Sequence, residues 1–447
     1  MERLAALCDG VAAVRAVHAI GRVVAVGRGT LTVAGIETVA AVGDLLHIRS
    51  ARPSEGEVIG LSPQGSTALV AGSLEGIALG DRVDLAGPPL LYPCRGWLGR
   101  IVSARGLPLD GRPLPRGAAG LPLDRPPPPA ALRRRLGDRL PTGLAAFDSL
   151  LPLVRGQRIG LFAGSGVGKS TLLGQLARGV AADVVVVALI GERGRELRDF
   201  VEDVLGPDRL SRSVVVAATS DESPLLRRRC ALAAMTVAEW FRDEGAQVLF
   251  LADSVTRFAE AHREVALAGG EVASLRGHPP SVAQRIMALA ERAGPGAAAG
   301  GDITGIFSVL VAAADMDEPV ADILRGTLDG HVVLDRAIAE RGRFPAIDLL
   351  RSVSRALPQA ATAAENGAIG RARQLLGAYE RAEMAIRAGL HLPGADPLVD
   401  AAIRVWPALD AFLGEPAAGI DAAFERLRAC LAPAQGIDRP GGAEGQA

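Results

Sequence analysis

The sequence predicts an α/β protein: a central, mostly parallel sheet flanked by helices, with a small β-barrel before it and a helical domain after it. Short β-branched runs broken by glycine fill residues 21–91. From about Thr142 to Ser354, β-like runs alternate with helical stretches, and from Asn366 to Leu431 the pattern is helical with one break at Pro393-Gly394. Alternating strands and helices are typical of a parallel sheet covered on both faces.

Composition limits the classes of protein that the chain can belong to. Its 447 residues suggest about two to four domains, and 49% hydrophobic with 22% charged residues is typical of soluble globular proteins. A net charge of −1 and a pI near 6.6 argue against general affinity for nucleic acid or anionic membranes. Aromatic residues make up only 3%, so a nucleotide site would have few aromatic walls.

The cysteines and the apolar runs indicate the cellular compartment of the protein. Four widely spaced cysteines form no CxxC pair, which favours reduced thiols and the cytosol: Cys8, Cys94, Cys230 and Cys430. The sequence shows neither a run of transmembrane length nor a secretory signal, so membrane association is expected to be peripheral.

Residues 1–20 predict a short amphipathic helix, because apolar residues recur at helical spacing: Leu4, Leu7, Val11, Val14 and Val17. Such a helix would pack on its own domain or dock a partner, and the sequence favours neither.

Residues 21–91 predict a small closed barrel, because short strand-like runs are separated by turn signals at nearly regular intervals. The runs are 23–26, 31–33, 45–48, 57–59, 67–70 and 82–85. Phe, Tyr and Trp do not occur between Gly21 and Leu90. A barrel that binds single strands interleaves basic and aromatic residues, so a structural or ring-forming role is expected.

Residues 92–141 are rich in proline and predict an extended linker rather than a folded unit. The core domain is expected over 142–360, the helical domain over 361–432, and a disordered glycine-rich tail over 433–447. Strand-like runs of the core domain are 158–163, 184–190, 214–218, 248–253 and 303–312.

A phosphate-binding loop lies between the first of these strands and a helix. Lys169 is the only lysine of the chain, since the other 48 of its 49 basic side chains are arginines. Small residues let backbone N–H groups face phosphate oxygens, Lys169 would reach the β- and γ-phosphates, and the Ser170 hydroxyl would bind Mg²⁺. An accidental glycine-rich turn is the alternative. The predicted nucleotide-binding residues are Ala163, Gly164, Ser165, Gly166, Val167, Gly168, Lys169, Ser170 and Thr171.

Three further positions are candidates for chemistry. Asp253 ends an apolar strand and can hold Mg²⁺, or it caps the next helix. Glu192, followed by Arg193, also comes at a strand end and can polarise a water, or it belongs to a solvated charge cluster. Arg355 can stabilise transition-state charge from a neighbouring subunit, although spacing alone favours an ordinary surface arginine.

From about Gly21 to Glu415 the chain resembles the flagellar and type III secretion export ATPases, relatives of the catalytic head subunits of rotary ATP synthases. The motifs that carry the resemblance are 162–170, 191–196, 253–259, 277–282, 344–348 and 352–355. The resemblance implies a RecA-like P-loop core that hydrolyses ATP with Mg²⁺. It implies catalytic roles for Lys169, Glu192, Arg193 and Arg355, and metal binding by Ser170 and Asp253.

The resemblance also implies partners. Because Glu192 and Arg355 occur in one chain, it implies a homohexameric ring with complete sites at every interface. It further implies a stator-like regulator at the N-terminus, export chaperones and cargo at the C-terminal domain, and an export gate at the inner membrane, where a cytoplasmic ATPase would be peripheral. No nucleic-acid partner is expected.

Three alternatives remain. Flagellar export is preferred over virulence-type (injectisome) secretion because 341–348 and 352–355 look more flagellar. A catalytically silent ring subunit that binds ATP for structure is disfavoured by Glu192. An RNA translocase of related fold is disfavoured by the non-aromatic, non-basic barrel.

Overall fold

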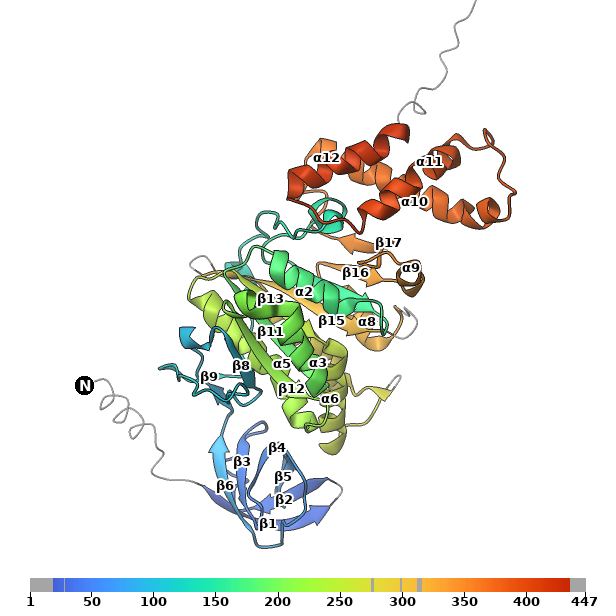
Figure 1. Ribbon diagram of the computed structural model, residues 1–447. Helices are drawn as coiled ribbons and strands as arrows, with labels where there is room; N and C mark the ends of the chain where they lie inside the picture. Colours follow the sequence, from blue (N-terminus) through green and yellow to red (C-terminus); the bar gives the residue numbers. More distant parts are fainter. Residues whose placement is uncertain (1–18, 28, 275–276, 298–299, 312–315, 435–447) are drawn as a thin grey trace, which may run out of the picture.

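In the computed structural model, residues 19–434 are described, except 28, 275–276, 298–299 and 312–315. The barrel and the C-terminal helices lie at opposite ends of the central α/β domain (Figure 1). Of the helix predicted for 1–20, residues 1–18 lie outside the described part of the chain.

The predicted six-stranded barrel is confirmed. Its antiparallel strands close in the order β1-β2-β5-β4-β3-β6. Apolar residues alternate into its interior, where Val33, Leu46, Ile48 and Val58 are fully buried. The strands are β1 (Ile20–Gly27), β2 (Thr30–Ala34), β3 (Leu45–Arg49), β4 (Ser54–Ser62), β5 (Gly65–Val70) and β6 (Arg82–Gly87).

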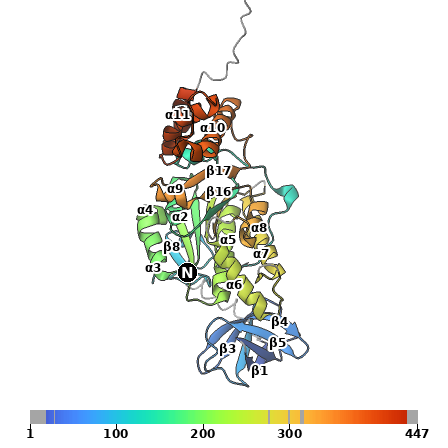
Figure 2. The same cartoon turned by 90° about the vertical axis from the view of Figure 1, so that its right-hand side faces the viewer.

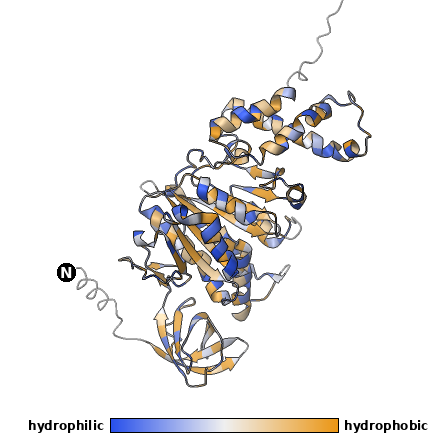
Figure 3. Ribbon diagram, viewed as in Figure 1, coloured by the Kyte–Doolittle hydropathy of each residue, from blue (hydrophilic) through white to orange (hydrophobic). Residues whose placement is uncertain are grey.

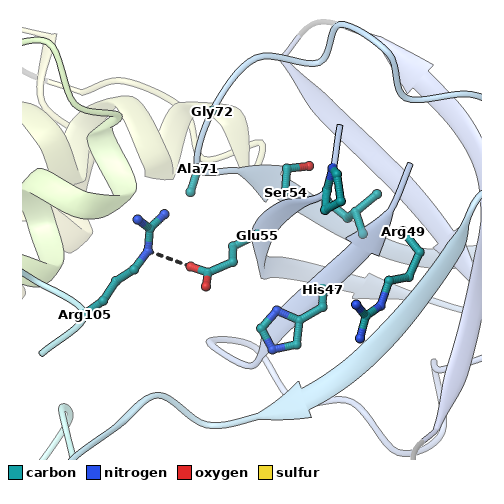
Figure 4. Close-up of a pocket in the computed structure, with 9 residues that line it drawn as sticks. His47, Arg49, Ser54, Glu55, Ala71, Gly72 and Arg105 are labelled. Atoms are coloured by element: carbon teal, nitrogen blue, oxygen red, sulfur yellow. Dashed lines mark ion pairs between the residues drawn. The ribbon is translucent and has the colours of Figure 1, made fainter. Parts of the chain in front are cut away.

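Ion pairs join the barrel to the central domain. Glu57 on β4 is 5% exposed and pairs with Arg228 and Arg229 of helix α5 (Pro224–Asp243). Glu55 pairs with Arg105 at 2.6 Å across a cavity of about 550 Å³ (Figure 4). Because the cationic groups at this junction already face carboxylates, the cavity belongs to the contact between domains rather than to a ligand site.

The predicted, mostly parallel central sheet is confirmed. Its order is β17-β16-β10-β15-β13-β11-β12-β8, and β17 pairs antiparallel with β16. The short β14 (Gly294–Pro295) pairs antiparallel with β15. The path strands are β8 (Arg100–Ser103), β10 (Arg158–Ala163), β11 (Val184–Glu192), β12 (Ser213–Thr219), β13 (Val248–Asp253), β15 (Asp302–Leu310), β16 (Gly330–Leu334) and β17 (Ile347–Ser354).

Helices cover both faces of this sheet, which explains why its strands are nearly continuous apolar runs, coloured orange in Figure 3. Alternate residues of β11 enter two cores: Val185 and Val187 pack in the core that includes Leu172, whereas Val184 and Val186 pack in the core that includes Cys230. Helices α2 (Lys169–Gly179) and α4 (Gly206–Leu210) lie on one side, and α6 (Val255–Ala268), α7 (Pro280–Arg292) and α8 (Pro319–Thr327) on the other (Figure 2).

The segment predicted to be a linker is partly folded into the central domain. Residues 100–103 form β8, which pairs parallel with β12 at the edge of the sheet. Arg100 is buried and donates two hydrogen bonds to Asp110, at 2.6 and 2.8 Å. Farther along, Arg292 donates to the carbonyl of Leu123. The proline-rich composition concealed this strand, because four residues at a sheet edge carry little periodicity.

The C-terminal domain consists of α10 (Ala363–Arg387), α11 (Pro397–Phe412) and α12 (Ile420–Leu431). A second break, at 413–419, was missed. It contains Gly419, whose φ of 141° favours glycine. Residues 432–434 form a turn with Ala434 buried, so the disorder predicted for 433–447 is wrong at its first two residues. The remaining tail, 435–447, lies outside the described residues.

Two further findings concern the described part of the chain. No helix in it is both long enough and apolar enough to cross a membrane. Its three cysteines, Cys94, Cys230 and Cys430, are free thiols, as predicted.

A buried ion pair fixes the linker, and its removal tests the packing. The Glu239 carboxylate is 1% exposed and faces Arg292 at 2.8 Å and Arg125 at 3.6 Å. Because Glu239→Gln leaves the buried guanidinium of Arg292 without its counter-charge, we expect a loss of about 3 kcal/mol in the free energy of unfolding. Urea denaturation measures this loss. The matched control is Glu340→Gln, whose exposed partner is Arg336; an equal loss in both variants would contradict the prediction.

Candidate active site

The phosphate loop occupies residues 164–168, between β10 and α2. Gly166 and Gly168 have φ values of 77° and 88°, in the left-handed region that favours glycine. These conformations allow successive N–H groups to point to one side and form an anion-binding concavity. Val167 is buried and anchors the loop. The loop and the first turn of α2 also present exposed residues, namely Ser165, Gly166, Ser170 and Thr171.

Lys169 pairs with the carboxylate of Asp253 at the end of β13. Both side chains are largely buried, with 11% and 4% exposed. The Ser308 hydroxyl, on β15 between β10 and β13, donates to Asp253 Oδ1 at 2.7 Å. Ser308 was missed in the sequence, where its only signal is a hydroxyl in an apolar strand.

The residues beside the loop fit a hard divalent cation. The Asp253 carboxylate and the exposed Ser170 hydroxyl offer oxygen ligands, which Mg²⁺ prefers. The loop amides offer donors for phosphate oxygens that share the ion. The donor set therefore suits Mg²⁺ bound together with a nucleotide.

Glu192 ends β11 at a β-bulge. Ile190 and Glu192 pair with consecutive residues of β12, so Gly191 between them, with φ 69°, is the extra residue. Burial raises the pKa of Glu192 to about 7, helped by a hydrogen bond to Glu196 and the charge of Asp253, while Lys169 opposes the shift. The carboxylate thus shares the electrostatic field of Lys169 and Asp253 and has a pKa suited to accepting a proton near neutral pH.

Arg193 lies outside this group. Its side chain is 77% exposed and pairs with Glu196 at 3.0 Å. The structure therefore brings Lys169, Asp253 and Glu192 together, and leaves the Arg193 guanidinium at the surface beside them.

Arg355 lies at the end of the sheet opposite the phosphate loop, where the parallel strands begin. Its N–H donates to the carbonyl of Asp329, and the N–H of Asp329 donates to the carbonyl of Arg158, the first residue of β10. The phosphate loop follows the last residue of β10, about 17 Å away at 3.3 Å per residue. The Arg355 guanidinium donates to the carbonyl of Arg325 at 3.2 Å. Within one chain, Arg355 is therefore separated from the phosphate loop by the length of a strand.

Known proteins share this architecture. Residues 143–354 match the nucleotide-binding domain of the ATP synthase alpha/beta family, and residues 361–429 match the T3SS EscN ATPase C-terminal domain. The flagellum-specific ATP synthase of Caulobacter vibrioides is 46% identical over 419 residues, which cover 91% of this chain and 94% of that protein. The chain belongs to the flagellar and type III secretion ATPases.

Other relatives agree with this membership. The type 3 secretion system ATPase of Xanthomonas euvesicatoria is 41% identical over 89% of this chain and 90% of its own. The assembled ATPase EscN of enteropathogenic E. coli has a TM-score of 0.87 and 36% identity, covering 92% of this chain and 100% of that one. The predicted export-ATPase family, its fold and its ATPase activity are thereby confirmed.

One more side chain of this export ATPase borders the loop. A Cβ on Gly168 would lie 3.3 Å from the ring of Phe344, which is 52% exposed. An exposed ring beside a phosphate loop can stack on a nucleotide base. The sequence motif contained Phe344, but only the fold places it against Gly168.

Lys169→Arg tests whether charge alone suffices at the loop. Arginine keeps the charge, but its planar fork differs in shape from the compact ammonium that pairs with Asp253. We expect phosphate release from Mg-ATP to fall to background. Arg178→Lys, the reverse exchange on the same helix, should retain activity. An active Lys169→Arg variant would show that the geometry of this site tolerates either cation.

Proposed function

We propose that this ATPase hydrolyses ATP with Mg²⁺ and couples hydrolysis to the unfolding, release and export of flagellar proteins through a type III secretion apparatus. The observation that carries the proposal is the grouping of Lys169, Asp253 and Glu192 at one edge of the sheet. A phosphate loop alone would also suit a kinase or a structural nucleotide site. The glutamate with a raised pKa adds a group that can orient water for in-line attack on the γ-phosphate.

Each side chain has a distinct role in this proposal. On nucleotide binding, Lys169 would exchange Asp253 for the β- and γ-phosphates, and Ser170 and Asp253 would hold the metal. Bound Mg²⁺ supplies positive charge that offsets the charge of the phosphate oxygens. Glu192 orients the attacking water and accepts its proton. Arg193 would join the site only by leaving Glu196.

We infer a homohexameric ring in which Arg355 acts on the site of the next subunit. Its position at the far edge of the sheet supports this, because the guanidinium lies a strand length from its own loop. A head-to-tail ring presents one edge of each subunit to the opposite edge of its neighbour. EscN, the relative solved as an assembled ATPase, supports self-assembly.

The remaining partners are proposals from the family. EscN was also solved in complex with its central stalk EscO (TM-score 0.83, 36% identity), which supports a stalk-like partner here. A stator-like regulator, export chaperones with cargo and a membrane export gate complete the proposed set, at the cytoplasmic face of the inner membrane. Injectisome export is the alternative, since EscN and the Xanthomonas relative serve type III secretion. Several flagellum-specific relatives favour the flagellar role.

Glu192→Gln tests hydrolysis against silent nucleotide binding. The amide keeps the shape but cannot take a proton, so we expect ATP turnover to fall by about 10²- to 10⁴-fold. Nucleotide binding should persist, because the loop and Lys169 are untouched. Glu202→Gln, at an exposed pair with Arg198, is the matched control. Unchanged turnover in Glu192→Gln would identify the chain as a silent subunit or place the base elsewhere.

Mixing two inactive variants tests whether Arg355 acts on the site of the neighbouring subunit. Arg355→Ala should lower turnover by about 10³-fold or more. When it is co-assembled with Glu192→Gln, about a quarter of the interfaces of a random ring combine an intact Glu192 with an intact Arg355 of the neighbour. Turnover should then recover to a measurable fraction. If the mixture stays as inactive as its components, Arg355 acts within its own chain or not at all.

A further inference from the structure

In the segment 129–136, Arg133 turns inward between two exposed leucines, Leu132 and Leu136. Arg133 is only 18% exposed, whereas Leu132 is 61% and Leu136 39% exposed. The Arg133 guanidinium donates to the carboxylate and the backbone carbonyl of Glu291 on α7, each at 2.9 Å. An inward arginine between two exposed leucines is the reverse of the usual arrangement on a soluble surface, which makes the leucines candidates for a contact.

The segment is anchored at Arg134 and again just after its last residue. Arg134 donates to Asp302 at 2.6 Å and to the carbonyls of Gly300 and Gly301. After Leu136, the N–H of Gly137 donates to the carbonyl of Arg155 at 3.0 Å. The backbone that carries the leucines is therefore held by hydrogen bonds, which lowers the conformational entropy lost when a partner binds.

An ion-pair ladder connects the segment to the backbone of Arg355. Glu291 accepts from Arg133 on one side and from Arg158 at 2.5 Å on the other. Arg158 in turn donates to the carboxylate of Asp329 at 3.0 and 3.1 Å, and the Asp329 carbonyl accepts the N–H of Arg355. Although burial opposes it, Arg158 and Arg133 hold the pKa of Glu291 below its usual value, so the ladder stays charged.

The ladder lies on the side of the sheet opposite the phosphate-loop helix. Figure 2 shows α7 and α8 on one side and α2 and α4 on the other, with the turquoise turn of the segment, η2 (Ala130–Leu132), on the side of α7 and α8. On α7, Met287 is 42% exposed and lies one turn before Glu291, the residue that binds Arg133.

We propose that Leu132, Leu136 and Met287 dock against the neighbouring copy of this chain, and that the ladder from Arg133 through Glu291, Arg158 and Asp329 couples this contact to the position of Arg355. The inference rests on the proposed ring with a borrowed arginine. Arg355 can act on a neighbour only if its edge of the sheet enters the interface, and the ladder makes the segment continuous with that edge. The occupant is therefore a second copy rather than cargo or a membrane.

Replacing the two leucines by charged residues tests the contact. For the double variant Leu132→Glu/Leu136→Glu, the protein concentration at half-assembly should rise roughly tenfold or more, because two apolar anchors are lost from an interface. Mass photometry with Mg²⁺ and a non-hydrolysable ATP analogue measures assembly. Turnover per chain should fall at low protein concentration and recover at high concentration, while nucleotide binding by the monomer stays unchanged. Leu390→Glu, a 74% exposed leucine of the C-terminal domain, is the control.

The outcomes separate this proposal from the proposed function. Parental assembly and turnover in the double variant, or equal weakening by Leu390→Glu, would overturn the docking contact while leaving the Glu192 and Arg355 results untouched. If the glutamate pair fails to fold, Leu132→Ser/Leu136→Ser carries the same test.

Glu291→Gln tests the ladder separately, because it breaks the ion pairs without altering the apolar surface. We expect kcat to fall roughly tenfold with an unchanged KM and unchanged assembly, as for a loss confined to the transition state. A merely structural role would lower assembly and stability instead. An unchanged kcat would remove the coupling to Arg355.

Discussion

The direction of the strands in the central sheet is the constraint on which the site depends. The carboxyl ends of parallel strands meet at the same end of the sheet, so the phosphate loop after β10, Asp253 at the end of β13 and Glu192 at the end of β11 lie close together. β17 runs the other way and therefore carries Arg355 to the opposite end. One chain thus carries all the proposed groups but separates Arg355 from the other three by the length of a strand.

The pair between Lys169 and Asp253 sets the resting state of the site. Both groups are buried, and separating a buried ion pair is costly unless each partner gains another. An incoming triphosphate with its cation offers both replacements at once. The hydrogen bond from Ser308 orients the Asp253 carboxylate independently of its counter-ion. The same charges act on Glu192, whose raised pKa depends on burial and on Asp253 as well as on Glu196.

Elsewhere in this chain, arginines form the ion pairs that stabilise the packing. Arg100 binds Asp110, Arg229 binds Glu57 and Arg292 binds Glu239, each through two hydrogen bonds from one planar guanidinium. These forks fasten the linker and the barrel to the central domain. The single lysine lies where the proposed mechanism needs a flexible point charge that changes partners, which gives a physical reason for its rarity.

Local patterns in the sequence determined the secondary structure and the chemistry of the loop. The runs 158–163 and 248–253 became β10 and β13 residue for residue, and the six-stranded barrel followed from its turn signals. Periodicity reports which face of an element is buried, but not which strand lies beside it. Only the tertiary structure could therefore recruit β8 to the sheet, place Ser308 on Asp253 and Phe344 beside Gly168, and separate Arg355 from the loop. Those relations arise between residues far apart in the chain, where strand order and direction, rather than local propensity, decide what meets.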